Sequence, residues 1–154
     1  MTVRFRNVDA DLLGPVDLWP YEALVTAIER GTATDWARIA RAIERRPWGE
    51  VARQLEEYFG YERPYGVAPL LERVIARART AAEQRERAEV AGEVRALQER
   101  SGLGAEAFAR AIGTSRSRLS TYRSGRVIPS AALMVRMRGV ADGAPQVADA
   151  PYER

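Results

Sequence analysis

The stretch that decides the fold is VRALQERSGLGAEAFARAIGTSRSRLSTYRSGRVIPSAALMVRM, residues 94–137. Within it, Ala109 places a small side chain where the backbones of two steeply crossing helices come closest. Gly113, four residues later, supplies a left-handed turn that a side chain would resist. Thr114 or Ser115 can then cap the next helix, because both side chains carry an oxygen that accepts a bond from a backbone N–H. The stretch therefore predicts two short helices joined by a tight turn.

The helix expected after Gly113 has two faces of different character. Leu119 and Tyr122 are three residues apart and point back toward a core that includes Phe108 and Ile112. The opposite face is polar, carries an arginine, and is narrow enough to enter the major groove of DNA. Its residues are Arg116, Ser117, Ser120 and Thr121.

A further helix is predicted downstream of this pair. The segment 124–126 forms a turn around Gly125, and Pro129 with Ser130 provides a stop and a cap. The apolar positions of this helix are Leu133, Met134 and Met137.

These motifs together resemble the DNA-binding domain of the phage Cro and repressor family, also called XRE-like helix-turn-helix proteins. The resemblance covers residues 90–141, about a third of the chain, and the N-terminal part shows none. It implies a lambda-repressor-like fold and double-stranded DNA as the partner. By analogy, the positions that contact base edges are Arg116, Ser117 and Thr121. The positions that contact phosphate are Ser115, Arg118, Ser120, Arg123 and Arg126.

The chain departs from the family pattern at three places. Gly104 and Ala105 stand where the family often has a Ser/Thr cap followed by Gln, so one cap and one phosphate contact are missing. Gln98 and Arg123 stand where the family often has an Arg–Glu pair, which leaves at best a single hydrogen bond. The fifth helix of the family is also lacking. We therefore expect the N-terminal bundle or a second subunit to cover the apolar residues Leu133, Met134 and Met137.

The positive charge of the chain is concentrated in this segment. All 24 basic residues are arginine, and the formal net charge is +3. Residues 90–141 carry nine arginines and three carboxylates, a net charge of +6, whereas residues 1–89 have a net charge of −1 and residues 142–154 of −2. A compact basic segment favours a polyanionic partner, of which nucleic acid is the commonest.

The composition disfavours several classes of protein. The chain has no cysteine and no histidine, so it lacks disulfides, thiolate metal sites, a cysteine nucleophile, the usual zinc ligands and the usual general base. Glu56 and Glu57 are adjacent carboxylates, but neighbouring helix residues point apart and are typical of a solvated face. We therefore predict no enzyme, no catalytic residue, no metal and no cofactor. There is no long apolar run and no apolar leader, which favours a cytoplasmic, nucleoid-associated protein without a membrane partner.

The N-terminal part is predicted to be helical. Helices are expected from Pro20 to Gly31, from Thr32 or Thr34 to Pro47, and from Trp48 to Gly60 as a stop. The last two share the pattern Trp-x-x-aliphatic-Ala-Arg-x-aliphatic-Glu. It predicts two amphipathic helices whose tryptophans, Trp36 and Trp48, share one core. The alternative is that these two helices form a second DNA-reading helix pair, although the turn between them lacks a glycine. In the loop 60–69, the tyrosine rings are expected to pack against the bundle.

The predicted fold class is all-α: an N-terminal helical bundle joined by a long connector helix to the helix-turn-helix domain. We assign residues 1–16 to an arm, 17–78 to the bundle, 79–89 to the connector, 90–141 to the DNA-binding domain and 142–154 to a disordered tail. The polar connector can be a solvated helix, supported by pairs such as Glu83 with Arg87 and Arg85 with Glu89, or a coiled-coil seam in a dimer.

Two functions fit this organisation. The first is a bacterial transcriptional regulator, more often a repressor, that binds a two-fold operator as a homodimer joined through its bundle. The alternative is an antitoxin or adaptor whose bundle holds a protein partner and whose DNA binding is autoregulatory. The sequence does not decide between them, and it gives neither the operator nor an effector.

Overall fold

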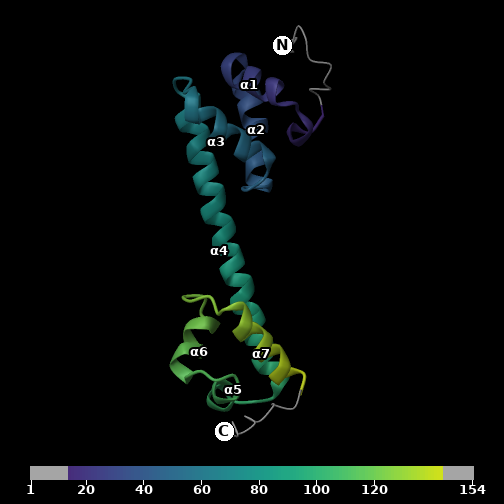
Figure 1. Ribbon diagram of the computed structural model, residues 1–154, viewed down its shortest axis with the longest axis vertical. Helices are drawn as coiled ribbons and strands as arrows, with labels where there is room; N and C mark the ends of the chain where they lie inside the picture. Colours follow the sequence, from purple (N-terminus) through teal and green to yellow (C-terminus); the bar gives the residue numbers. More distant parts are fainter. Residues whose placement is uncertain (1–13, 144–154) are drawn as a thin grey trace, which may run out of the picture. The chain divides into compact units, whose positions relative to one another are not determined.

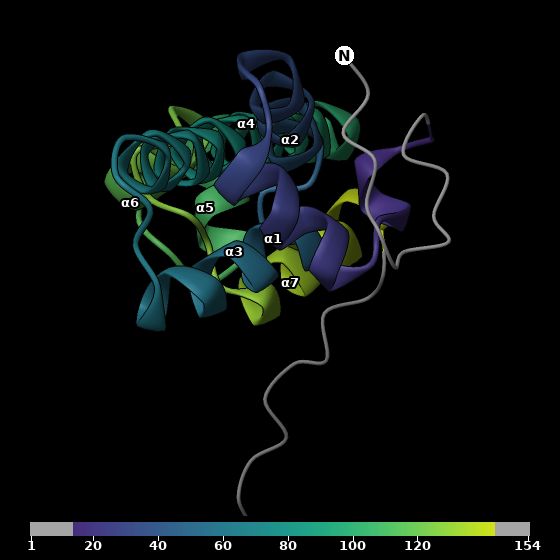
Figure 2. The ribbon, with the colours of Figure 1, turned by 90° about the horizontal axis from the view of Figure 1, so that it is seen from above.

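The computed structural model describes residues 14–143, and within this range it contains helices and loops but no strand (Figures 1 and 2). The all-α prediction is therefore confirmed. The remaining parts of the predicted arm and tail, residues 1–13 and 144–154, lie outside the described residues. The chain divides into two compact units, one ending at Glu83 and the other beginning at Gln84.

The first unit consists of a short 3₁₀ helix, three α-helices and the first part of a fourth. They are η1 (Val16–Leu18), α1 (Tyr21–Arg30), α2 (Ala33–Arg45), α3 (Glu50–Tyr61) and the beginning of α4 (Val67–Ser101). Each element contributes apolar side chains to one core, among them Val16, Leu24, Ile28, Ile39, Ile43, Leu55, Phe59, Leu71 and Ile75. Val16 belongs to this core although the sequence places it in the arm.

The start of α2 follows from its sequence. Thr32 is the N-cap residue, and its backbone N–H donates to Asp35 Oδ2 at 2.8 Å in a capping box. Trp36, in the first turn, donates from Nε1 to the carbonyl of Ala27 at 2.9 Å, which fastens α2 to the last turn of α1. Its ring is partly buried against the core, as the shared-core interpretation requires.

Two expectations for the next segment are wrong, and a third holds only in part. Trp48 is 51% exposed, because α3 begins only at Glu50 and Trp48 lies in the preceding turn; the buried tryptophan is Trp19. Gly60 does not stop α3, which continues to Tyr61, and the left-handed glycine of this segment is Gly66, with φ +79°. Of the loop tyrosines, Tyr65 is exposed and does not pack against the bundle. Tyr61 is also largely exposed, but its ring lies edge-on to that of Tyr58, with 5.6 Å between the ring centroids.

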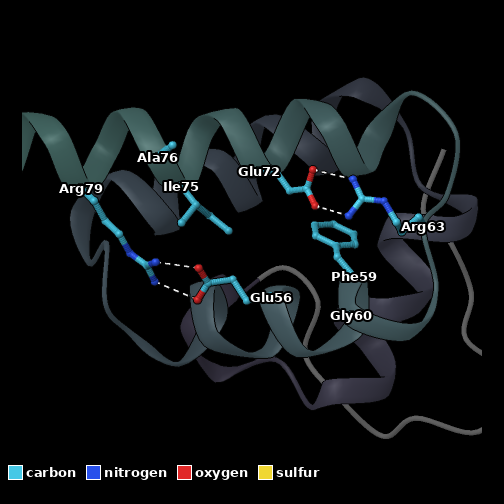
Figure 3. Close-up of a pocket in the computed structure, with 8 residues that line it drawn as sticks. All are labelled: Glu56, Phe59, Gly60, Arg63, Glu72, Ile75, Ala76 and Arg79. Carbon is cyan, nitrogen blue, oxygen red and sulfur yellow. Dashed lines mark hydrogen bonds and ion pairs between the residues drawn. The ribbon is translucent and has the colours of Figure 1, made fainter.

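Two bidentate ion pairs join α3 and the loop after it to α4 (Figure 3). Arg79 donates from Nη1 and Nη2 to the Glu56 carboxylate at 2.6 and 2.9 Å, and from Nε to the carbonyl of Pro47 at 3.0 Å. Arg63 donates to the carboxylate of Glu72 at 2.6 and 2.8 Å. The pairs lie at the two ends of a hollow of about 330 Å³. The predicted pairs Glu83–Arg87 and Arg85–Glu89 are not among the ion pairs of the described residues.

Two tyrosines of the first unit have pKa values that their surroundings raise. The buried Tyr58 donates its hydroxyl to Glu29 at 2.8 Å, and the Tyr21 and Tyr61 hydroxyls are in contact. Burial, followed by the bond to Glu29, raises the pKa of Tyr58 above its ordinary value. The bond to Tyr61, followed by desolvation, raises the pKa of Tyr21 to about 12.

We expect the first unit to lose stability as pH rises above about 10, the pKa of tyrosine in an unfolded chain. Between that value and the higher pKa in the folded state, only the unfolded chain releases the protons, so unfolding becomes easier. Urea unfolding at pH 8, 10 and 11 measures the loss. The Tyr21→Phe, Tyr58→Phe double variant should lose less stability over this interval. An equal loss in the variant and the wild type would contradict the assignment.

The second unit consists of the last part of α4, α5 (Ala105–Ala111), α6 (Arg116–Arg123) and α7 (Ala131–Ala141). Its core includes Val94, Leu97, Phe108, Ile112, Leu119 and Tyr122. The three apolar residues of α7 are buried in the same core, so the expectation that they need an outside cover is wrong. The reason is that α7 runs to Ala141, and ion pairs hold it on α4. Arg138 lies 2.8 Å from Glu93, and Arg100 lies 2.8 Å from Asp142.

Candidate nucleic-acid interface

The turn between α5 and α6 has the geometry expected of it. Gly113 has φ +75°, the left-handed conformation that L side chains resist. The next N–H, that of Thr114, donates to the carbonyl of Ala109 at 2.9 Å and closes the end of α5. Of the two possible caps, Ser115 is the one used, because its Oγ accepts a bond from the N–H of Arg118 at 3.2 Å. Gly113 and Ser115 thus fix where α6 begins.

Two glycines of this unit give a matched stability test. Gly113→Ala should cost about 1–2 kcal/mol, because the added Cβ strains a left-handed residue. Its nearest atom would be Arg136 Nη1 at 3.6 Å, so crowding adds little. Gly139→Ala, inside α7 with nothing within 4 Å, should gain about 0.5–1 kcal/mol through helix propensity. Chemical denaturation measures both. Shifts in the same direction would contradict a left-handed turn at Gly113.

Buried side chains anchor α6 from behind. Leu119 is 1% exposed, and Tyr122, one turn later, is also buried. They belong to one core with Phe108 and Ile112 of the preceding helix and its cap. Ala109, the predicted point of close approach, is buried too. The predicted orientation of α6 is therefore present, with its apolar face held in the core.

The opposite face of α6 is polar and open to solvent. Four of the predicted contact residues on it are exposed: Arg116, Ser117, Arg118 and Ser120. Thr121 is half-buried, and its hydroxyl donates to the carbonyl of Arg118 at 2.7 Å. It can still accept a hydrogen bond or present its methyl group, but its proton is already used. In Figure 1, α6 lies at the outer edge of the second unit.

The turn after α6 lies close to α4. Gly125 has φ +75°, and a Cβ added there would lie 3.6 Å from both Ala91 Cβ and the carbonyl oxygen of Arg87. The exposed Arg126 follows directly. Ser130 then caps α7, its Oγ accepting from the N–H of Leu133 at 3.2 Å. Both the turn and the cap are as predicted.

The end of α6 is joined to α4 by a contact that the sequence did not indicate. Arg95 donates from Nη1 to the backbone carbonyl of Arg123. Gln98, one turn along α4, donates instead to the carbonyl of Leu103 at 3.5 Å. Arg123 is half-buried, and both its Nε and the Oε1 of Gln98 are buried without a hydrogen-bond partner. The bond expected between Gln98 and Arg123 is therefore not formed.

Arginine is the only charged residue type in the segment that contains α6 and α7, although Arg110 and Arg138 pair with Glu106 and Glu93 outside it. Residues 107–141 contain seven arginines and no carboxylate. Gly104 caps α5 without a side-chain bond, as its sequence predicts.

Among residues 14–143 there is no group of three or more Asp or Glu side chains placed to hold a metal ion. None of the helices in this range is long and apolar enough to cross a membrane. The α6 surface offers several N–H and O–H donors to which an anion can bind.

Comparison with known proteins gives one match, and it falls on this segment. A family model described as a helix-turn-helix domain matches residues 75–138, which include α5, α6 and most of α7. The match supports a helix-turn-helix domain here and DNA as its partner, and the Cro/XRE assignment remains a prediction. No curated protein and no solved structure matches the chain significantly.

Proposed function

We propose that this chain is a sequence-specific transcriptional regulator that binds double-stranded DNA with α6 in the major groove. The observation that carries the proposal is the polar face of α6, which is exposed while Leu119 and Tyr122 hold the opposite face in the core. A short helix anchored in this way can present side chains to base edges without losing its own packing.

Roles for the individual residues are proposed by analogy with the family that the sequence resembles. Arg116, Ser117 and Thr121 are assigned to base edges. Because the hydroxyl of Thr121 already donates to the carbonyl of Arg118, Thr121 can only accept a hydrogen bond from a base or contact it through its methyl group. The phosphate contacts are assigned to Ser115, Arg118, Ser120, Arg123 and Arg126. Of these, Arg123 is the least accessible, because it is half-buried.

The regulator is proposed to act as a homodimer, more often as a repressor, on an operator with two-fold symmetry. One α6 reads only a few base pairs, so two copies are needed for useful specificity. The first unit is the proposed dimerisation element. Analytical ultracentrifugation of the full chain tests this, and a monomer at micromolar concentration, both free and bound to DNA, would contradict it.

Binding of the full-length protein to a pool of genomic duplexes tests the proposal as a whole. Bound sequences should share a motif with two similar half-sites. The logarithm of the affinity should fall linearly with the logarithm of the salt concentration, because arginines displace counterions from phosphates. Binding without an enriched motif would contradict sequence specificity, and the absence of any salt-sensitive binding would contradict DNA binding altogether.

A second candidate function is an antitoxin or adaptor that binds a protein through the first unit. It is favoured by large apolar side chains that are exposed around α3 and the start of α4, namely Trp48, Tyr61, Tyr65 and Leu70. Co-expression with the neighbouring open reading frame tests it. Capture of that product by the wild type, but not by a Trp48→Ala, Tyr65→Ala variant, would support this function. Equal capture by both would contradict it.

A further inference from the structure

The turn after α6 lies against a face of α4 that carries two arginines. A Cβ added at Gly125 would lie 3.6 Å from both Ala91 Cβ and the carbonyl oxygen of Arg87, so the turn packs on this part of the helix. One turn further along α4, Arg95 donates from Nη1 to the carbonyl of Arg123, the last residue of α6. Arg87, Ala91 and Arg95 follow one another at spacings of four residues and therefore share one helix face.

The charged residues of this part of α4 are divided between its faces. Residues 84–101 contain four arginines and four carboxylates, so the segment has no net charge. In a helix of 3.6 residues per turn, Arg87 and Arg95 lie on the face beside the α6–α7 turn, whereas three of the four carboxylates lie on the opposite face. These three are Glu86, Glu89 and Glu93. The face of α4 beside the turn is therefore positively charged although the segment as a whole is neutral.

The arginines next to this turn are not neutralised within the second unit. None of the ion pairs among residues 14–143 includes Arg87, Arg95, Arg123 or Arg126. The bond from Arg95 goes to a neutral carbonyl, and the Nε of Arg123 is buried without a hydrogen-bond partner. Arg87, Arg95 and Arg126 are exposed. Like charges gathered next to one turn repel one another, and a bound polyanion relieves this repulsion.

We propose that this face of α4 belongs to the DNA-binding surface, with Arg87 and Arg95 as further contacts to backbone phosphates. The inference rests on the proposed function of α6 and extends its interface to a third helix. Arg126, in the turn, is already assigned to phosphate, and Arg87 and Arg95 lie on the helix face beside that turn. They continue the contact along the same DNA strand.

Arg95 has donors for both the protein and the DNA. A guanidinium group carries five N–H donors, so Arg95 can keep its Nη1 bond to the end of α6 and donate to a phosphate oxygen from Nη2. It thereby connects the position of α6 with the position of the DNA backbone. Arg87 has no such bond to α6, which makes it the cleaner residue to replace.

Arg87→Gln tests the inference in the full-length chain. The probe is a duplex that the wild type selects from the genomic pool, and fluorescence anisotropy measures its affinity over a series of salt concentrations. The variant should bind about eightfold more weakly in 0.1 M salt, and the slope of affinity against salt should fall by about one, as expected for one lost phosphate contact. The selected motif should not change, because phosphate contacts carry no direct sequence information.

Arg85→Gln is the matched control. Arg85 is also exposed and lies two residues earlier in α4, on a different face, so its replacement removes the same charge from the same helix. Affinity and salt slope should stay at their wild-type values. An equal loss in the two variants, or no loss with Arg87→Gln, would overturn the inference while α6 still binds DNA. A wild type that binds no duplex would overturn the proposed function and, with it, this inference.

Duplexes with a single neutral methylphosphonate locate the contacts on the DNA backbone. At the phosphate that Arg87 binds, the modification should weaken the wild type but not weaken Arg87→Gln any further. Arg95→Gln should show the same pattern at a neighbouring phosphate, a result that loss of its bond to Arg123 alone would not produce. Losses that simply add at every modified phosphate, for both variants, would show that neither arginine contacts the backbone.

Discussion

Replacing Phe108 by alanine is expected to lower the free energy of unfolding of the second unit by about 3–5 kcal/mol. Phe108 is fully buried at the centre of the core that holds α6. Its removal leaves a cavity in the core that it shares with Leu119 and Tyr122, because the surrounding structure relaxes only partly into the space. Because the apolar face of α6 is held by this core, DNA binding should be lost together with stability.

Phe59→Ala is the matched control for this prediction. Phe59 is 3% exposed in the core of the first unit, so a side chain of the same size is removed from the other core. Hydrogen exchange followed by mass spectrometry should show faster exchange in α5 and α6 for Phe108→Ala, and in α1 to α3 for Phe59→Ala. Faster exchange in α5 and α6 with Phe59→Ala alone would contradict the assignment of two separate cores.

Replacing Arg116 by alanine is expected to remove about 1–3 kcal/mol of discrimination at one base pair of each half-site. Arg116 is the first residue of α6 and is exposed, and arginine binds the O6 and N7 atoms of guanine in a bidentate geometry. Selection of bound duplexes from a random pool, with wild type and variant side by side, measures the change. The motif should lose its preference at one position and keep it elsewhere.

Arg118→Ala provides the comparison within the same helix. Arg118 is also exposed but is assigned to phosphate, so its loss should weaken all duplexes evenly and reduce the slope of affinity against salt by about one. If Arg116→Ala weakened all duplexes evenly and Arg118→Ala removed the preference at one base position, the two roles would be exchanged. If both variants gave only an even loss, base reading by Arg116 would be refuted.

The second unit was largely predictable from sequence because its constraints are local. A left-handed glycine at 113, a cap at Ser115 and an apolar pair at Leu119 and Tyr122 each depend on neighbours a few residues away. Those features determine where α5 ends, where α6 begins and which face of α6 is exposed. The role of Arg95 was not predictable, because it bonds to a backbone carbonyl 28 residues away, and any residue type could supply that carbonyl.

The errors in the first unit have a different origin. The Trp48 pattern repeats that of Trp36, but Gly49 rather than Trp48 precedes α3, and a shift of the helix start moves the ring to the surface. Likewise, Gly60 and Gly66 are indistinguishable by residue type, and only the backbone shows which of them is left-handed.

The run of residues 107–141, with arginine as its only charged side chain and no histidine, also bears on the conditions to which the protein can respond. Guanidinium groups stay protonated at every pH that a living cell reaches. A change in pH therefore leaves the charge of this surface unaltered, while a rise in salt concentration weakens its attraction for any polyanion. We therefore expect binding of nucleic acid by this surface to depend on ionic strength and not on pH.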